Sequence, residues 1–234
     1  MSDEIVSPRG LPVRDILPLG RVRRVMAKTM MESVDRAALS QIARQVDLTE
    51  LQDKRRQEPE AGSLSLNVYL LAAVARTLPR HPLLNAELVD EHILVYERVN
   101  LGMAIAIPDG LIVGVIHNAD QMTLTELASR AEDLALKART GALQYEDIEG
   151  GTFTLSNMGM LGVDSAFALP RPPEAAILLV GRARGRPDFR EGEIIQREEA
   201  WFNLTYDHRF IDGATGAKFL LDVEETLRHP EKLL

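Results

Sequence analysis

The order of helical and extended segments along the chain constrains its fold more than any other feature. Apolar residues recur at helical spacing in four longer segments, at about residues 20–33, 65–78, 124–139 and 214–227. Extended, β-rich segments lie between them, at residues 39–46, 99–107, 111–116, 151–156 and 175–181. The two types are mixed without a regular strand–helix–strand alternation, which favours an α+β fold over a doubly wound parallel sheet.

Shorter signals add a small helix and several turns. The helix is expected over residues 51–57. One hairpin is expected over residues 87–96, and a second between residues 194–196 and 199–206. Residues 108–110 read Pro-Asp-Gly and predict a turn between two strands, because glycine tolerates a positive φ.

The first 17 residues differ from the rest of the chain. They contain Pro8 and Pro12 and show little hydrophobic periodicity. We therefore interpret residues 1–17 as an N-terminal arm or linker remnant and residues 18–234 as one domain. A chain of 234 residues is long enough to bury a sizeable core in such a domain.

Composition excludes several classes of function. The formal net charge of −8 argues against a nucleic-acid-binding surface, which needs clustered lysine and arginine. The absence of cysteine excludes a disulfide framework and a thiolate nucleophile, and without a histidine pair at metal spacing we expect no metal site. We see neither a signal peptide nor an apolar stretch of the roughly 18 residues that a membrane span needs. The expected location is the cytoplasm, or an organelle matrix if a targeting segment is missing.

Four of the five histidines show no distinctive pattern. His81 and His229 each precede a proline near a helix end, which predicts a cap or a surface position. His92 falls in the expected turn of the first hairpin, and His117 ends a strand.

His208 lies between a predicted strand and a predicted helix, in the sequence Tyr-Asp-His-Arg-Phe-Ile-Asp-Gly of residues 206–213. One interpretation is structural: Asp212 caps the following helix, and His208 is a hydrogen-bonded, partly buried imidazole. The other is catalytic, because a strand-to-helix junction can hold a side chain rigidly and leave it open to a substrate. Spacing alone favours the structural interpretation.

Five motifs in the same order along the chain resemble those of one enzyme family. Residues 207–214, DHRFIDGA, are similar to the signature D-H-R-x-I/V-D/N-G-A of the catalytic domains of dihydrolipoamide acyltransferases, the E2 components of 2-oxo acid dehydrogenase complexes. The other four matches are GTFTLSNMGMLG at 151–162, VNLGMAIAIPDGL at 99–111, PPEAAIL at 172–178 and the segment 18–33. Together they cover about residues 18–234, and identify that range as the acyltransferase catalytic domain.

The resemblance implies a fold, an assembly and partners. The expected fold is a two-layer, chloramphenicol-acetyltransferase-like α+β fold with a mixed sheet and flanking helices. Such domains form homotrimers with each active site at a subunit boundary, and the trimers build cubic or dodecahedral cores, whose symmetry corresponds to about 24 or 60 subunits. The implied partners are the E1 and E3 components and a lipoyl domain acting in trans, since a lipoyl domain is missing here or separate.

The implied reaction moves an acyl group between a dihydrolipoyl thioester and coenzyme A. His208 matches the catalytic histidine, a general base for the thiol of coenzyme A, and an imidazole with a pKa near 6.5 suits a thiol with a pKa near 8.5. Ser156 matches the hydroxyl residue that would donate a hydrogen bond to the oxyanion, from the neighbouring subunit. Asp212 stands where the family has Asp or Asn, so its implied role is positional.

Four residues are expected to help bind coenzyme A: Arg23, Asn157, Met158 and Gly159. Arg23 matches the arginine of the opening motif. It could instead pair with Asp212 or be a plain surface arginine, and the sequence does not choose between these roles.

The chain departs from the family pattern at several sites, among them residues 37–45, which lack the usual I-P-H-F-like pattern, and other readings stay open. Lys54 lacks the context of a lipoylated lysine, and residues 168–171 read ALPR where P-I-I-N is usual. The alternatives are a related acyltransferase that uses an acyl-carrier protein, and a non-catalytic oligomeric assembly core. The acyl group that is preferred also stays open.

Overall fold

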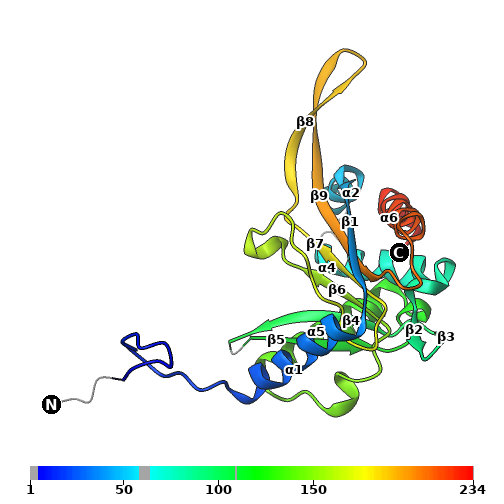
Figure 1. Ribbon diagram of the computed structural model, residues 1–234. Helices are drawn as coiled ribbons and strands as arrows, with labels where there is room; N and C mark the ends of the chain where they lie inside the picture. The colour runs from blue at the N-terminus through cyan, green and yellow to red at the C-terminus, as the bar shows by residue number, and fades with distance from the viewer. Residues whose placement is uncertain (1–4, 58–63, 109, 234) are drawn as a thin grey trace.

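A mixed β-sheet forms the centre of the fold in the computed structural model, which describes residues 5–57, 64–108 and 110–233 (Figure 1). The strand order is β1-β9-β7-β6-β4-β5, with β8 pairing to β9 beyond this path. Among the strand pairs of the described residues, only β4–β6 and β6–β7 are parallel. The strands are β1 Leu39–Asp47, β4 Leu101–Ile107, β5 Gly110–Ile116, β6 Phe153–Asn157, β7 Ala176–Val180, β8 Arg184–Arg190 and β9 Glu193–Asp207. The α+β prediction is confirmed.

The predicted helices are confirmed with small shifts of their ends. They are α1 Arg21–Arg36, α2 Thr49–Gln57, α4 Leu66–Thr77, α5 Leu124–Thr140 and α6 Gly213–Arg228. Helix α5 shows why the sequence signals worked. It begins at a capping box of Thr123 and Glu126 and ends at Gly141, whose φ of 70° is accessible to glycine without strain.

Helices α4, α5 and α6 bury one face of the sheet (Figure 1). Helix α5 packs on β4 and β5, α6 packs on β1 and β9, and α4 lies against both helices. Because α4 is enclosed in this way, nine of its 12 residues are buried, and its sequence is apolar nearly all round. The rings of Phe153 and Phe219 join sheet and helix with their centroids 5.6 Å apart.

The opposite face of the sheet is polar but also buried. Side chains alternate between the faces of a strand, so the residues between the core positions of β6 and β9 point away from the helices. They are Thr154, Ser156, Asn203, Thr205 and Asp207. Residues 163–174 cover this face: Ser165 Oγ donates to Asn203 Oδ1 at 2.6 Å, and Gln41 Nε2 donates to the carbonyl oxygen of Ala166 at 2.9 Å.

The second predicted hairpin is wrong. Residues 193–207 form one 15-residue strand, β9, without a turn at residues 197–198, and its hairpin partner is β8, which the sequence did not predict. The polar run that suggested a turn is paired on both sides, since Arg197 forms ion pairs with Asp47 and Asp188. The hairpin projects beyond the body of the molecule (Figure 1).

The first predicted hairpin is confirmed as β2 Ala86–Val89 and β3 His92–Val95, with Asp90 at a φ of 52° in its turn. His92 therefore begins a strand instead of lying in the turn. The turn predicted at residues 108–110 includes Asp109, which lies outside the described residues.

The capping position predicted for His81 is confirmed, because its backbone is the C-cap of the short 3-10 helix Leu78–Arg80 and the N-cap of Pro82–Leu84. The surface position predicted as the alternative is wrong. The residue is buried, with Nε2 2.8 Å from Asp222 Oδ2 and its ring edge-on to Phe219. Helix α6 encloses it, which local sequence does not reveal. His229 does lie at the C-cap of α6, beside Glu225 at 3.0 Å.

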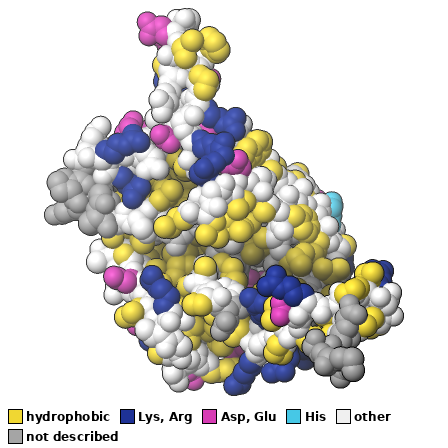
Figure 2. All heavy atoms as spheres, turned by 90° about the vertical axis from the view of Figure 1, so that its left-hand side faces the viewer, with side chains coloured by type: hydrophobic (Ala, Val, Ile, Leu, Met, Phe, Trp, Pro, Cys, Tyr) yellow, Lys and Arg dark blue, Asp and Glu magenta, His cyan; other side chains and the backbone are white. Residues whose placement is uncertain are grey.

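The N-terminal segment extends away from the body and exposes apolar side chains (Figure 1). Ile16, Leu17 and Leu19 are 70%, 85% and 56% exposed, and Ser33 is the one buried residue of α1. Figure 2 shows the face on this side, where hydrophobic side chains gather across a hollowed centre with lysine and arginine around it. The boundary at residue 17 stays a prediction.

Candidate functional site

His208 follows the last residue of β9, and its side chain is exposed. Its backbone N–H donates to the carbonyl oxygen of Ala38 at 2.8 Å, just before β1. We call residues 207–212 the His208 junction. The main chain of this junction is thus tied to the neighbouring edge strand, while the imidazole stays accessible. Its ring centroid lies 5.6 Å from that of Tyr206.

Asp207 anchors the His208 junction, a role that sequence reasoning missed. Its buried carboxylate accepts hydrogen bonds from the backbone N–H of Ala38 at 3.3 Å and of Arg209 at 3.1 Å. The guanidinium of Arg209 donates to the same carboxylate from Nε, at 3.0 and 2.9 Å to its two oxygens, and from Nη2, at 2.6 Å. The hydrogen bond to Asp207 raises the pKa of Arg209 above its ordinary value. The available signal was the position of both residues beside His208 in the D-H-R motif.

Asp212 is the N-cap of α6, as the structural interpretation predicted. Its Oδ1 accepts from the backbone N–H of Thr215 at 2.7 Å, and its backbone is extended. This hydrogen bond lowers the pKa of the Asp212 carboxyl below its ordinary value. The geometry fits a positional role, and its participation in catalysis stays a prediction.

Ser156 lies on the polar second face of β6 and is 7% exposed. Next to it, Asn157 is held within the chain: its Nδ2 donates to Asn67 Oδ1 at 3.4 Å and its Oδ1 accepts from Gly159 N–H at 3.0 Å. The backbone N–H of Met158 donates to Val180. Asn157, Met158 and Gly159 thus shape the loop after Ser156, and their binding of coenzyme A stays a prediction.

One chain does not bring Ser156 and His208 together. In the sheet register Ser156 lies beside Leu179, and Leu179 lies beside Asn203 of β9. The four steps from Asn203 to Asp207 span roughly 14 Å of extended strand, and two strand spacings add roughly 10 Å sideways. The two side chains are therefore too far apart within one chain to contact the same substrate atom.

Helix α1 carries Arg23 near its N-terminal end and approaches the His208 junction with its C-terminal end. Arg23 is exposed in the first turn of α1, and its role stays a prediction. At the other end of α1, a hollow of about 60 Å³ lies beside the junction. Its lining includes Arg36, Glu174, Asp207, Arg209 and Phe210.

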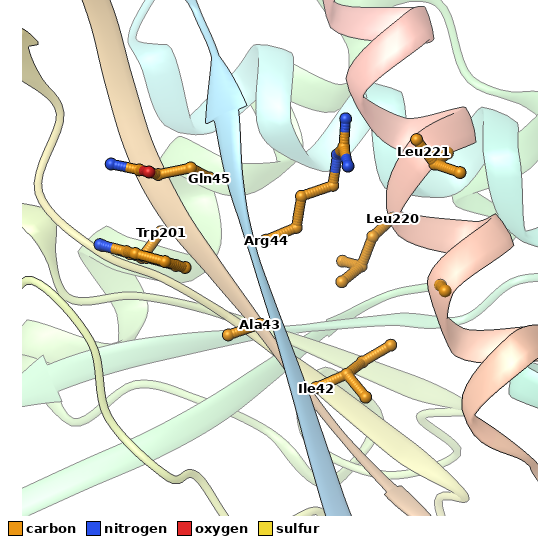
Figure 3. Close-up of a pocket in the computed structure, with 8 residues that line it drawn as sticks. Ile42, Ala43, Arg44, Gln45, Trp201, Leu220 and Leu221 are labelled. Atoms are coloured by element: carbon orange, nitrogen blue, oxygen red, sulfur yellow. The ribbon is translucent and has the colours of Figure 1, made fainter.

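A larger hollow of about 470 Å³ lies at the edge strand β1, away from these residues (Figure 3). Trp201, Ala43 and Gln45 lie on one side of the β1 ribbon, and Arg44 and Leu220 lie on the side toward α6. Its lining contains none of the predicted site residues.

No metal site or membrane helix is found among the residues that the structure describes. There, no group of three or more histidine, aspartate or glutamate side chains could hold a metal ion. Within the same ranges, no helix is long and apolar enough to cross a membrane.

Comparisons with known proteins agree with the fold and the motifs. A relative from Bacillus subtilis, the dihydrolipoyllysine-residue acetyltransferase component of an acetoin cleaving system, is 34% identical over 93% of this chain. The match covers 56% of that relative, so the chain spans about half the length of the curated relatives it matches.

Two solved structures align with a TM-score of 0.90 and 29% identity over 94% of both chains. One is Azotobacter vinelandii dihydrolipoamide acetyltransferase, from a study of one serine, one histidine and one asparagine in its catalytic mechanism. The other is the cubic core of the pyruvate dehydrogenase multienzyme complex. A chloramphenicol acetyltransferase aligns with a TM-score of 0.58 at 18% identity, which confirms the expected fold alone.

The family model described as "2-oxoacid dehydrogenases acyltransferase (catalytic domain)" matches residues 13–234, nearly the whole chain. The chain therefore belongs to the family of 2-oxoacid dehydrogenase acyltransferase catalytic domains.

Proposed function

We propose that this chain transfers an acyl group between a dihydrolipoyl thioester and coenzyme A, in an oligomer whose active sites lie between subunits. The observation that carries the proposal is the position of His208, exposed on an anchored strand-to-helix junction. Family membership adds the reaction class. The spacing of the residues supports their roles. In the Azotobacter protein the histidine lies 52 residues after the serine, and the asparagine lies 4 residues after the histidine. Ser156, His208 and Asp212 have the same spacing in this chain.

The reaction follows from these groups. The His208 imidazole takes the proton of the coenzyme A thiol, and the thiolate attacks the carbonyl carbon of the S-acyl dihydrolipoyl group. The carbonyl oxygen becomes an oxyanion, which accepts a hydrogen bond from the Ser156 hydroxyl of another subunit. The bond between the acyl carbon and the lipoyl sulfur then breaks. The leaving thiolate takes the proton back from His208, so atoms and charges balance.

A shared active site explains why one chain keeps its two groups apart. The neighbouring subunit would supply the Ser156 hydroxyl, and the exposed apolar arm offers surface for contacts between copies. A homotrimer, within a core of cubic type, is the assembly we propose, with a lipoyl domain that presents the acyl group and the E1 and E3 components as partners. The exposed imidazole fits access for two thiol substrates, coenzyme A and dihydrolipoamide.

Mixing two inactive variants tests this proposal. His208→Ala and Ser156→Ala should each lose activity by at least roughly a hundredfold, because base and oxyanion donor are removed. Chains unfolded, mixed in equal amounts and refolded should recover about a quarter of wild-type activity, because a site needs an intact histidine from one chain and an intact serine from another. Acetyl, succinyl and branched-chain dihydrolipoamide thioesters are the substrates to assay.

Three results would contradict the proposal. No recovery on mixing, with oligomers of normal size, would show that both groups do not act in a shared site. Full activity of His208→Ala would remove the base. Activity of the wild type with an acyl-carrier protein alone, and none with coenzyme A, would favour the carrier-protein alternative.

A further inference from the structure

Glu174 is a buried acidic residue that the proposed chemistry does not use. It lies just before β7, and its side chain is fully buried. An ionised carboxylate is costly to bury unless it is paired and hydrogen-bonded. Its partners therefore indicate what it does.

Two side chains satisfy the Glu174 carboxylate. Thr154 Oγ1 donates to Oε2 at 2.6 Å, and Arg171 Nε donates to Oε1 at 3.2 Å. Arg171 in turn donates through Nη1 to the carbonyl oxygen of Ile148 at 2.6 Å. Arg171 belongs to the segment 168–171, where this chain departs from the family pattern.

Two glycines leave room for this network. A Cβ on Gly151 would lie 2.6 Å from Arg171 Nη2 and 2.9 Å from Glu174 Oε1. A Cβ on Gly102 would lie 2.5 Å from Thr154 Oγ1. Real Cβ atoms do not approach so closely, so a side chain at either position would displace atoms of the network.

The network connects the two elements that carry the proposed catalytic groups. Thr154 lies two residues before Ser156 on the same face of β6. Glu174 is also next to Ala175, whose carbonyl oxygen accepts a hydrogen bond from the backbone N–H of Asp207 at 2.9 Å. Asp207 directly precedes His208. A carboxylate between them therefore fixes the junction against a central strand of the sheet.

We propose that Glu174 is a positioning residue for acyl transfer, holding the His208 junction in register with the strand of Ser156 through Thr154 and Ala175. The inference rests on the proposed function. Glu174 touches no reacting atom, so its removal lowers the turnover number and leaves the Michaelis constants for both thiol substrates within about twofold.

A double-mutant cycle tests the link. Glu174→Gln and Thr154→Val should each lower kcat by roughly ten- to a hundredfold, because small misplacements of catalytic groups have effects of this size. The double variant should be no slower than the worse single variant, since both break the same link. Thr154→Ser keeps the hydroxyl and should restore kcat to within about threefold of wild type. Glu149→Gln, at an exposed position, is the matched control for charge and should match wild type.

The outcomes separate this inference from the proposed function. If the wild type transfers acyl groups to coenzyme A, and Glu174→Gln and Thr154→Val have the same kcat as the wild type, the inference is overturned and the proposed function is not. Multiplied losses in the double variant, or Thr154→Ser as slow as Thr154→Val, also overturn it. A wild type without transfer activity overturns the proposed function instead. If Glu174→Gln does not assemble, the Thr154 pair decides the matter, with oligomer size measured for each variant.

Discussion

Replacing Asp207 by alanine tests how the His208 junction is held in place. The substitution removes the acceptor of the backbone N–H groups of Ala38 and Arg209, and the ion-pair partner of the Arg209 side chain. The bond from the backbone of His208 to the carbonyl oxygen of Ala38 remains. The variant therefore removes the side-chain anchor and leaves the main-chain one.

The expected cost in stability follows from these contacts. A partly buried N–H that loses its acceptor costs about 1–3 kcal/mol. The Arg209 side chain is 43% exposed, so water screens its ion pair and replaces part of its bonding, which limits that loss to about 1 kcal/mol. We expect Asp207→Ala to lower the free energy of unfolding by about 3 kcal/mol and to reduce kcat by roughly tenfold or more.

Urea unfolding at one fixed protomer concentration measures this cost, because oligomer stability depends on concentration. Arg209→Ala is the matched control: it removes only the ion pair and should cost about 1 kcal/mol. A loss below about 0.5 kcal/mol for Asp207→Ala would refute the anchoring argument. Equal losses in both variants would show that the ion pair holds the junction and the backbone contacts do not.

Two further predictions concern stability elsewhere. Gly181→Ala should lower the free energy of unfolding by about 2–3 kcal/mol, because its Cβ would overlap the carbonyl oxygen of Asp164. Gly20→Ala is the control and should cost less than about 1 kcal/mol, because no atom lies within 4 Å of the added Cβ. Similar thermal unfolding midpoints for the two variants would contradict this prediction. Burial raises the pKa of Glu174 to about 7. Because the Glu174 carboxyl binds its proton more tightly in the folded state than in the unfolded state, protonation stabilises the fold. The free energy of unfolding therefore falls as the pH rises from about 4.5 to about 7, by about 3 kcal/mol in all. Urea unfolding at a series of pH values measures this decline, which should be absent from Glu174→Gln. If the free energy of unfolding depends on pH in the same way in the wild type and in Glu174→Gln, the prediction is refuted.

The sequence alone determined most elements and the main candidate residue. Helices such as α5 carry their own periodicity and end signals, and those are local properties of the chain. The His208 motif was recognisable because its eight residues are contiguous. Asp212 was predicted as a helix cap for the same reason, since a cap bonds residues only three positions away.

Tertiary structure alone decided how distant segments meet. The single strand β9 exists because β8 pairs with its first half and β1 and β7 with its second, and a polar run such as residues 196–199 does not predict those pairings. The burial of His81 against α6 and of Glu174 against β6 likewise depends on residues far away in sequence.

The separation of Ser156 from His208 is the clearest case. The resemblance implied that Ser156 acts from a neighbouring subunit, but only the order of strands in the sheet shows how far apart the two residues lie in one chain. Strand order depends on long-range hydrogen bonding and on burial of both faces of the sheet, and local periodicity does not encode either.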